Sequence, residues 1–341
     1  MSHARPVAAR PAAALPLVLA LAACSGGAAP DPPGAVPQES TVQAEVGYPV
    51  TVDNCGTEVS LEAPPERIVT IKSAPTEMVL ALGLGDRLVG TAFADGPLPD
   101  DLADAGADVP VLAEQAPSSE VVLSTEPDLV YAGWESNLSA ETAGDRTALA
   151  DLGVATYVSP AACLEEGYQP DPLTFDGVFA DIIEAGDLLG APDAAADLVA
   201  AQQEELAAVA PSDSGLSALW YSSGSDTPYV GAGIGAPQML MDAIGVENIA
   251  ADIDDSWSSL SWEAIADAEP DLIILVDSAW NTAEYKIGQL EANPTTAALP
   301  AVQEGRYLIV DFPATEAGVR SVPAATELAD QLAQLESGPG S

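Results

Sequence analysis

One stretch of sequence occurs in similar form in both halves of the chain. Residues 118–132 read SSEVVLSTEPDLVYA, and residues 261–275 read SWEAIADAEPDLIIL. Each copy has a short helical pattern, a Pro-Asp stop and an apolar run that is typical of a buried strand. Short apolar runs alternate with helical ones around both copies, which is the pattern of a parallel sheet covered by helices on both faces. The chain is therefore predicted to contain two α/β lobes.

The other predicted elements follow the same alternation. In the first half, strands are predicted at 67–72, 88–92, 128–133 and 155–159, and helices at 75–86 and 138–152. In the second half, strands are predicted at 217–223, 271–279 and 306–312, and helices from Pro237, at 282–292 and at 323–336. Residues 48–61 alternate around Asn-Cys-Gly and predict a β-hairpin. Residues 173–210 have apolar positions at helical spacing and predict a long linking helix, with a break near Pro192.

The first residues form a separate targeting segment. Residues 1–24 combine Arg5 and Arg10 with an apolar run too short to span a bilayer, and small residues precede Cys24. This pattern resembles a bacterial lipoprotein signal that is cleaved before Cys24, whose thiol then carries lipid. An ordinary secretory leader is the alternative.

The predicted order of parts starts with this leader at 1–24. A flexible tether rich in Gly, Pro and Ala follows at 25–47. The N-terminal lobe is expected at 48–172, the linking helix at 173–210 and the C-terminal lobe at 211–341. Such a protein would be anchored by lipid to the cell membrane, on its extracytoplasmic face.

Composition excludes several classes of function. The chain has 53 acidic and 9 basic residues, and removal of the leader changes its net charge from −44 to about −46, which repels nucleic acid. The one histidine, His3, lies in the leader, so the mature chain has no imidazole for a catalytic triad, a zinc site or haem ligation. No catalytic residue, metal site or cofactor is predicted, and the chain is expected not to be an enzyme.

Two classes of function remain open at this point, an enzyme without histidine and an adhesion or sensor module. A hydrolase without histidine would need a carboxylate pair or a Ser-Lys pair. An adhesion or sensor module would not need the glutamate that both copies of the repeated stretch carry at the same position.

Cys55 and Cys163 are the cysteines that remain after Cys24, and in an exported protein they are expected to form a disulfide. Two buried free thiols are the alternative.

From Tyr48 to Leu335 the chain resembles the solute-binding lipoproteins of ABC importers, in the iron-siderophore and cobalamin class. The resemblance rests on APPERIVTIKSAPTEMVLALGLGDRLVG at 63–90, on both Pro-Asp-Leu strands and on the long linking segment. It implies two Rossmann-like lobes joined by a long helix, with a small-molecule ligand captured between them. It also implies a partner, the two-fold ABC permease with its ATPase. In that family a surface glutamate on each lobe docks onto permease arginines, and the matching positions are Glu120 and Glu263.

A narrower resemblance concerns the ligand. The segments TVDNCGTEV, WESNLSAE, LWYSSGSDTPYVGAGIGAPQM and DDSWSSLSWEA are similar to those of an actinobacterial subfamily said to import a deazaflavin coenzyme precursor. This resemblance implies a ligand with a planar tricyclic ring and an anionic phospholactate tail. A ferric siderophore or cobalamin is the alternative ligand.

Candidate ligand-binding residues follow from that chemistry. A planar ring favours aromatic walls, and the loops after the strands of α/β lobes are where clefts form. The candidates in such loops are Trp134, Tyr221, Ser222, Tyr229, Trp257 and Trp280, whereas Trp220 is expected in the core. An anionic tail needs positive charge, and the best placed of the few bases are Lys72 and Arg320, ahead of Arg146 and Lys286. Gly233 is expected to let the backbone approach the ligand.

Overall fold

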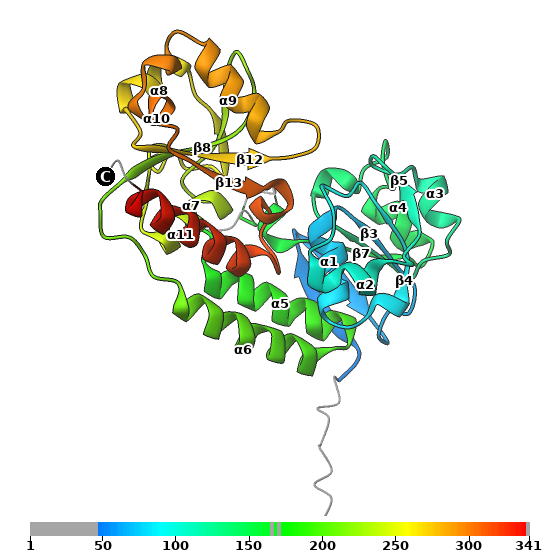
Figure 1. Ribbon diagram of the computed structural model, residues 1–341. Coiled ribbons are helices and arrows are strands. Elements are labelled where there is room, and N and C mark those ends of the chain that lie inside the picture. Colours follow the sequence, from blue (N-terminus) through cyan, green and yellow to red (C-terminus); the bar gives the residue numbers. More distant parts are fainter. Residues whose placement is uncertain (1–46, 164–166, 169–171, 339–341) are drawn as a thin grey trace, which may run out of the picture. The chain divides into compact units, whose positions relative to one another are not determined.

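The computed structural model describes residues 47–163, 167–168 and 172–338. These residues contain two larger β-sheets with their helices and a separate β-hairpin (Figure 1). The predicted leader at 1–24, the lipidation site Cys24 and the tether up to residue 46 lie outside the described residues. Within the described ranges, no helix is both long enough and apolar enough to cross a membrane.

The N-terminal lobe is built on a parallel sheet of five strands in the order β5-β4-β3-β6-β7. Its strands are β3 (Ile68–Ile71), β4 (Leu88–Ala92), β5 (Val111–Ala113), β6 (Leu129–Ala132) and β7 (Ala155–Val158). Its helices are α1 (Ser73–Ala81), α2 (Asp100–Gly106), α3 (Ser119–Leu123) and α4 (Arg146–Asp151). The helix predicted at 138–152 is shorter than expected, because Asp145 accepts hydrogen bonds from two backbone N–H groups and so starts α4 at Arg146.

The C-terminal lobe has a mixed sheet with the strand order β11-β9-β8-β12-β13, and β10 pairs with β8. Its strands are β8 (Ser217–Ser223), β9 (Tyr229–Gly231), β10 (Glu247–Asn248), β11 (Trp257–Ser259), β12 (Leu272–Asp277) and β13 (Tyr307–Asp311). Its helices are α7 (Ala236–Ile244), α8 (Trp262–Ala268), α9 (Ala283–Ala292), α10 (Pro300–Gln303) and α11 (Ser321–Ser337). Because β9 and β11 pair antiparallel, this sheet is not wholly parallel as predicted.

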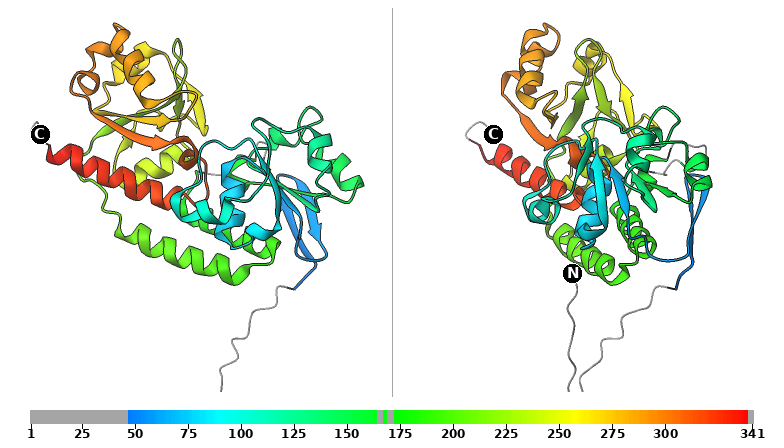
Figure 2. Two further views of the ribbon diagram at one scale, coloured as in Figure 1. Left: turned by 45° about the vertical axis from the view of Figure 1, so that its right-hand side comes forward. Right: turned by 90° about the vertical axis from the view of Figure 1, so that its right-hand side faces the viewer.

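The linking segment is interrupted near Pro192, as predicted, but its two helices fold back on each other rather than form one long helix. Helices α5 (Phe175–Leu189) and α6 (Pro192–Ala208) lie side by side (Figures 1 and 2). Gly190 ends α5 in the left-handed conformation, and Pro192 occupies the first turn of α6, where its missing N–H costs nothing. A Cβ atom on Gly186 would lie 2.3 Å from the Cβ of Ala195, so the close packing of the two helices requires this glycine.

The aspartate of each Pro-Asp copy starts a neighbouring strand. Asp128 accepts a hydrogen bond from the backbone N–H of Arg67, just before β3, and Asp271 accepts one from the backbone N–H of Ser217 in β8. The strands at the ends of the two copies are β6 and β12, and they pair in parallel with β3 and β8 respectively. The repeat therefore marks equivalent positions in two similar sheets.

A β-hairpin of β1 (Val50–Asn54) and β2 (Thr57–Leu61) precedes the first sheet, as predicted. Its turn residues Cys55 and Gly56 have φ angles of 51° and 74°. Positive φ at both central residues is the requirement of a two-residue hairpin turn whose twist matches that of its strands.

Candidate ligand-binding cleft

A cavity of about 530 Å³, here called the cleft, takes its lining from both lobes. The N-terminal lobe contributes Trp134, Ser136, Ala161, Ala162 and Cys163. The C-terminal lobe contributes Ser222, Ser223, Tyr229, Ile234, Asp255, Ser256, Trp257, Trp280, Phe312 and Glu316. Five predicted ligand-binding residues are among them: Trp134, Ser222, Tyr229, Trp257 and Trp280.

The aromatic residues give the cleft flat apolar surfaces. Tyr229 and Trp257 lie diagonally opposite each other on the paired strands β9 and β11, so their rings stack with centroids 5.9 Å apart and an angle of 15° between planes. Both were predicted in loops, and these two strands were missed because each has only three residues. Trp280 meets Phe312 edge to face and leaves 65% of its own surface exposed. Such faces suit a large ligand with flat apolar parts.

Tyr221 does not line the cleft, so its predicted role is corrected. Successive side chains of a strand point to opposite faces, and Ser222 faces the cleft. Tyr221 therefore lies on the other face, 2% exposed, where its ring meets Trp262 edge to face. Its hydroxyl donates to the backbone carbonyl of Gly224 at 2.7 Å. Trp220, predicted to lie in the core, is fully buried.

Gly233 has a structural role instead of a ligand contact. A Cβ atom there would lie 2.1 Å from the backbone oxygen of Ala251, and the N–H of Gly233 donates to the carbonyl of Ile253 at 3.0 Å. The glycine is needed because the segment 251–253 passes close to it. The neighbouring Ile234 lines the cleft in its place.

Lys72 is absent from the cleft lining and lies behind it. Its side chain is 2% exposed and its ammonium pairs with the carboxylate of Asp95, which is 4% exposed. The same ammonium lies 3.7 Å from the ring centroid of Trp134, a cation–π distance. Lys72 therefore supports a wall of the cleft, and the predicted contact with ligand is corrected.

Arg320 is also engaged elsewhere. Its guanidinium donates to both carboxylate oxygens of Glu77 in α1, at 2.7 and 2.5 Å, and to the backbone carbonyl of Pro97. Burial raises the pKa of Glu77, and the bond from Arg320 opposes that rise. Arg320 is absent from the lining of the cleft and lines a different cavity. Its expected role as a partner of an anionic ligand is therefore corrected as well.

The remaining bases of the mature chain all donate to backbone carbonyls or uncharged side chains. Arg67 donates to Glu126, Arg87 to Leu189, Arg146 to Asn54 and Thr156, Lys286 to Val276 and Asn281, and Arg306 to Asp271, with the backbone carbonyl as acceptor in each case. Among the residues that line the cleft there is no base. Arg146 and Lys286, the weaker candidates for an anion partner, are thus structural.

Two carboxyl groups do line the cleft, and neither was predicted. Glu316 accepts a hydrogen bond from Nε1 of Trp134 at 3.0 Å, and burial raises the pKa of Glu316. Asp255 lies in the loop before β11 and is exposed to solvent. The feature of the sequence that could have identified these two residues is their position near the ends of predicted strands. The lining of the cleft therefore combines aromatic surfaces with two carboxyl groups.

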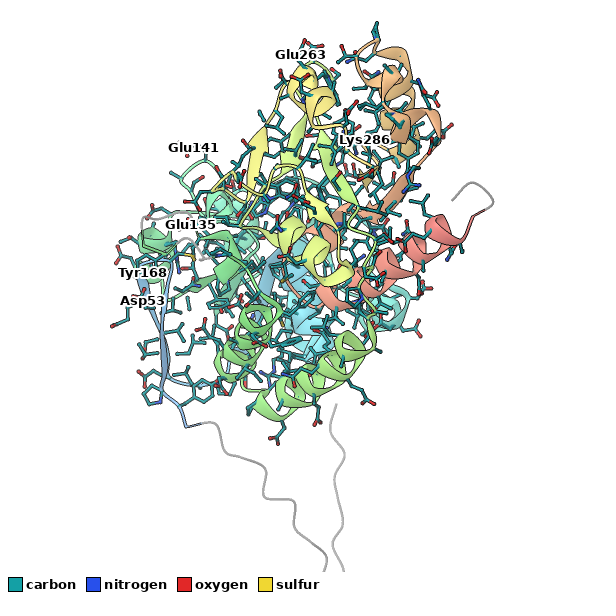
Figure 3. All side chains as sticks on the ribbon, turned by 90° about the vertical axis from the view of Figure 1, so that its left-hand side faces the viewer. Asp53, Glu135, Glu141, Tyr168, Glu263 and Lys286 are labelled. Carbon is teal, nitrogen blue, oxygen red and sulfur yellow. A yellow bond between two sulfur atoms is a disulfide. The ribbon has the colours of Figure 1, made fainter. Side chains whose placement is uncertain are left out.

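The two glutamates of the repeat occupy equivalent surface positions. Glu120 lies in the first turn of α3 and Glu263 in the first turn of α8, and both are exposed (Figure 3 labels Glu263). The N-cap residues Ser118 and Ser261 each accept a hydrogen bond from a backbone N–H of the first turn, at 3.4 and 3.1 Å. A carboxylate at such a helix N-terminus is stabilised by the helix dipole.

The structure joins Cys55 to Cys163 by a disulfide, with their Cα atoms 5.2 Å apart. Cys163 also lines the cleft, which its sequence position did not indicate. Among the described residues, no group of three or more His, Cys, Asp or Glu side chains could hold a metal ion.

Comparison with known proteins agrees with this architecture. The family model described as "Periplasmic binding protein" matches residues 68–314. The uncharacterized ABC transporter substrate-binding lipoprotein YvrC of Bacillus subtilis is 27% identical over 294 residues, which cover 84% of this chain and 86% of that protein. A cobalamin-binding protein of Halobacterium salinarum is 28% identical over 278 residues, which cover 77% of this chain and 67% of that protein.

A solved structure gives the same picture. The crystal structure of an ABC-type Fe³⁺-hydroxamate transport system from Saccharomonospora viridis superposes with a TM-score of 0.71 and 27% identity, over 84% of this chain and 99% of that one. The family model covers well over half of the chain, and its match includes strands of both sheets. The chain belongs to the periplasmic binding protein family.

Proposed function

We propose that this protein is the extracytoplasmic substrate-binding subunit of an ABC importer, and that its ligand is a metal chelate without net negative charge, a cobalamin or a ferric hydroxamate. The observation that carries this proposal is the lining of the cleft: aromatic surfaces, two carboxyl groups and no base. The relatives support the same class, since one is named for cobalamin and one for Fe³⁺-hydroxamate transport.

The charge of the cleft argues against an anionic ligand. Two like charges 4 Å apart repel each other by about 4 kcal/mol at an effective dielectric constant of about 20. A phospholactate close to the exposed carboxylate of Asp255 would meet that repulsion, whereas the raised pKa of Glu316 favours its neutral form, and Lys72 and Arg320 are already paired with carboxylates. We therefore propose the alternative ligand, a ferric siderophore or a cobalamin, in place of the deazaflavin precursor. Haem, with its two propionates, and ferric tricatecholates are disfavoured for the same reason.

A titration followed by tryptophan fluorescence tests the ligand class, because three tryptophans line the cleft. We expect cyanocobalamin or a ferric trihydroxamate to bind, and the deazaflavin precursor and a ferric tricatecholate not to bind. The variant Asp255→Asn/Glu316→Gln should bind the anionic probes more tightly. Asp254→Asn, which removes a neighbouring acid absent from the cleft lining, is the matched control and should not. Tight binding of the precursor to the unmodified protein, without binding of either neutral chelate, would refute the assignment.

Docking to the permease is proposed to use Glu120 and Glu263, one on each lobe, against arginines of a two-fold partner. Support comes from their equivalent, exposed positions at helix N-termini. The double variant Glu120→Ala/Glu263→Ala should keep its ligand affinity and lose uptake in cells. The matched control replaces Glu141 and Glu284, two other exposed glutamates, of which Glu284 also lies in a first helical turn. Normal uptake by the first pair would contradict the docking role.

The membrane anchor is proposed to be lipid on Cys24, which lies outside the described residues. The relative from Bacillus subtilis is named a lipoprotein, which supports this location on the extracytoplasmic face. Cys24→Ser should release the protein from the membrane fraction without changing ligand affinity. Retention of the variant in the membrane fraction would contradict a lipid anchor.

A further inference from the structure

Residues 159–163, here called the cleft wall segment, follow β7 directly. Ala161, Ala162 and Cys163 line the cleft, and Ser159 with the two alanines also lines an adjoining smaller hollow. The segment presents small side chains, so its backbone lies close to whatever the cleft holds. A small displacement of this segment would therefore change the shape of the cleft itself.

Few bonds attach this segment to the rest of the lobe. The N–H of Ser159 donates to the carbonyl of Ala132 at 2.9 Å, at the end of β7. Beyond that point, the hydrogen bonds of Pro160–Cys163 to other described residues stay inside the segment, from Ala162 to Ser159 and from Cys163 to Pro160. The disulfide from Cys163 to Cys55 is therefore the one covalent cross-link that holds the far end of the segment, across a sequence separation of 108 residues.

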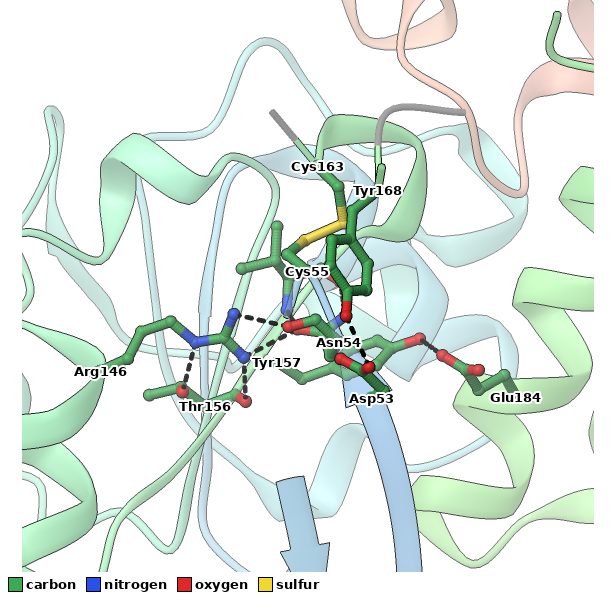
Figure 4. Close-up of a disulfide and its surroundings, with 10 residues drawn as sticks. Asp53, Asn54, Cys55, Arg146, Thr156, Tyr157, Cys163, Tyr168 and Glu184 are labelled. Carbon is green, nitrogen blue, oxygen red and sulfur yellow. Dashed lines mark hydrogen bonds between the residues drawn. A yellow bond between two sulfur atoms is a disulfide. The ribbon is translucent and has the colours of Figure 1, made fainter. Parts of the chain in front are cut away.

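The other end of the disulfide is firmly held (Figure 4). Cys55 lies in the tight turn of the β1-β2 hairpin, and the preceding Asn54 is 2% exposed. The side chain of Asn54 bonds to both the N–H and the carbonyl of Val158, each at 2.8 Å, and so acts as an extra strand partner at the end of β7. The guanidinium of Arg146 holds Asn54 in turn, through bonds to its side-chain and backbone oxygens at 2.9 Å. The disulfide links the cleft wall segment to this fixed point.

We propose that the Cys55–Cys163 disulfide is a positioning element of the ligand site, so that the affinity of the cleft depends on the thiol–disulfide state of this pair. The inference rests on the proposed function only in taking the cleft as the ligand site. A dithiol reagent reduces the pair in two steps. Its thiolate attacks one cysteine sulfur and breaks the S–S bond, which leaves a mixed disulfide and one cysteine thiol. The second thiol of the reagent then attacks the mixed disulfide and releases the other cysteine thiol. Two cysteine thiols and the oxidised reagent result. Among its contacts with the described residues, the cleft wall segment then keeps the attachments of Ser159, to the carbonyl of Ala132 and to the side chain of Tyr131, and its apolar packing.

Thermodynamic linkage gives a second consequence. If the disulfide raises ligand affinity, bound ligand must stabilise the disulfide by the same factor, and typical couplings are about 5- to 150-fold. Ligand in the cleft would also cover Cys163, whose side chain is only 5% exposed before binding. Half reduction of the complex should therefore need a more strongly reducing dithiothreitol buffer than half reduction of the free protein. A disulfide that only stabilised the fold, far from the site, would not show this protection.

The experiment uses the oxidised protein, the protein after dithiothreitol treatment, and the variant Cys55→Ser/Cys163→Ser. Cyanocobalamin and a ferric trihydroxamate are the probes. We expect the reduced protein and the variant to bind the probe about tenfold more weakly, and saturating probe to shift the reduction equilibrium about tenfold toward the disulfide. Circular dichroism checks that the reduced protein remains folded, which keeps the test valid if the serine variant does not fold.

Two control variants separate positioning from general stability. Leu332→Ala removes a core side chain that is 2% exposed on α11 in the other lobe, and it lowers stability without touching the cleft wall segment. Tyr168→Phe removes the hydrogen bond from Tyr168 to Asp53 on the same hairpin and leaves the disulfide in place. Both should keep probe affinity. Equal affinity of the oxidised and reduced proteins, no protection by the probe, or an equal loss in Leu332→Ala would overturn the proposal.

A measurement without ligand distinguishes failure of this inference from failure of the proposed function. If the oxidised protein binds neither probe, the ligand class is wrong, and hydrogen exchange of residues 161–163 then decides about the disulfide. We expect exchange of these amides to be about tenfold faster after reduction, while amides in β12 keep their rates. Unchanged exchange at 161–163 would overturn the positioning role whatever the ligand is.

Discussion

Removal of the ammonium of Lys72 by Lys72→Met tests how the cleft is supported. Lys72 and Asp95 are 2% and 4% exposed, so this replacement leaves a carboxylate buried without its partner. Breaking a buried ion pair in this way costs about 3–5 kcal/mol. Loss of the cation–π contact at 3.7 Å from the ring centroid of Trp134 adds up to about 2 kcal/mol. Asp95 keeps its hydrogen bond from the N–H of Ser73, so a total loss of about 4 kcal/mol is expected.

The measurement is the free energy of unfolding in urea for the native protein, Lys72→Met, Asp95→Asn and the double variant. In the double variant neither residue of the Lys72–Asp95 pair leaves a charge without its partner, so it should be at least about 2 kcal/mol more stable than the sum of the single losses predicts. Ligand affinity of Lys72→Met should fall only modestly, through Trp134. A loss in Lys72→Met of less than about 1 kcal/mol, or strict additivity in the cycle, would refute the idea that this pair is a buried support.

Three further predictions concern single substitutions. Desolvation lowers the pKa of Lys286 to about 8, below its unfolded value of about 10.4. The unfolded chain therefore binds more protons between about pH 8 and about pH 10, so the native protein should gain stability relative to Lys286→Met over this range, measured by urea unfolding. Burial, with a contribution from Glu184, raises the pKa of Asp181 to about 7, so Asp181→Asn should be more stable than the native protein at pH 8 and lose that advantage below about pH 4. Equal pH profiles would contradict either assignment. Gly133→Ala should lower the melting temperature, because its Cβ would lie 2.8 Å from the Cβ of Lys72, and the melting curve checks this.

Much of the fold could be predicted because its signals are local. Strands β4 and β8 have the predicted bounds, 88–92 and 217–223, since a short apolar run between turn signals marks a buried strand wherever it packs. The Pro-Asp repeat marked equivalent points of both sheets. The hairpin at 48–61 followed from alternation around a turn that needs positive φ. Absence of histidine after the leader depends on composition alone.

Short or folded-back elements escaped prediction for a physical reason. Strands β9 and β11 have three residues each, too few for a periodic pattern, and they are strands because β9 pairs with both β8 and β11 in the folded sheet. The break of the segment 173–210 near Pro192 was predicted, but its folding back at the left-handed Gly190 and the close contact at Gly186, which pack its two helices together, were not. Local periodicity predicts a helix but not which other helix it packs against.

The sequence by itself therefore determined the two α/β lobes, the family resemblance and the surface positions of Glu120 and Glu263. The tertiary structure decided the chemistry of the cleft. Alternation along β8 requires Tyr221 and Ser222 to face opposite ways, but only the packed sheet decides which face meets the cleft. In the sequence, Lys72 and Arg320 are two of the few bases and were predicted to meet an anionic ligand. In the folded protein they pair with Asp95 and Glu77, which are distant in sequence and close in space. A charge acts through distance and burial, which residue order does not record, so the pairing of these two bases and a cleft lining without a base emerge only in the folded protein.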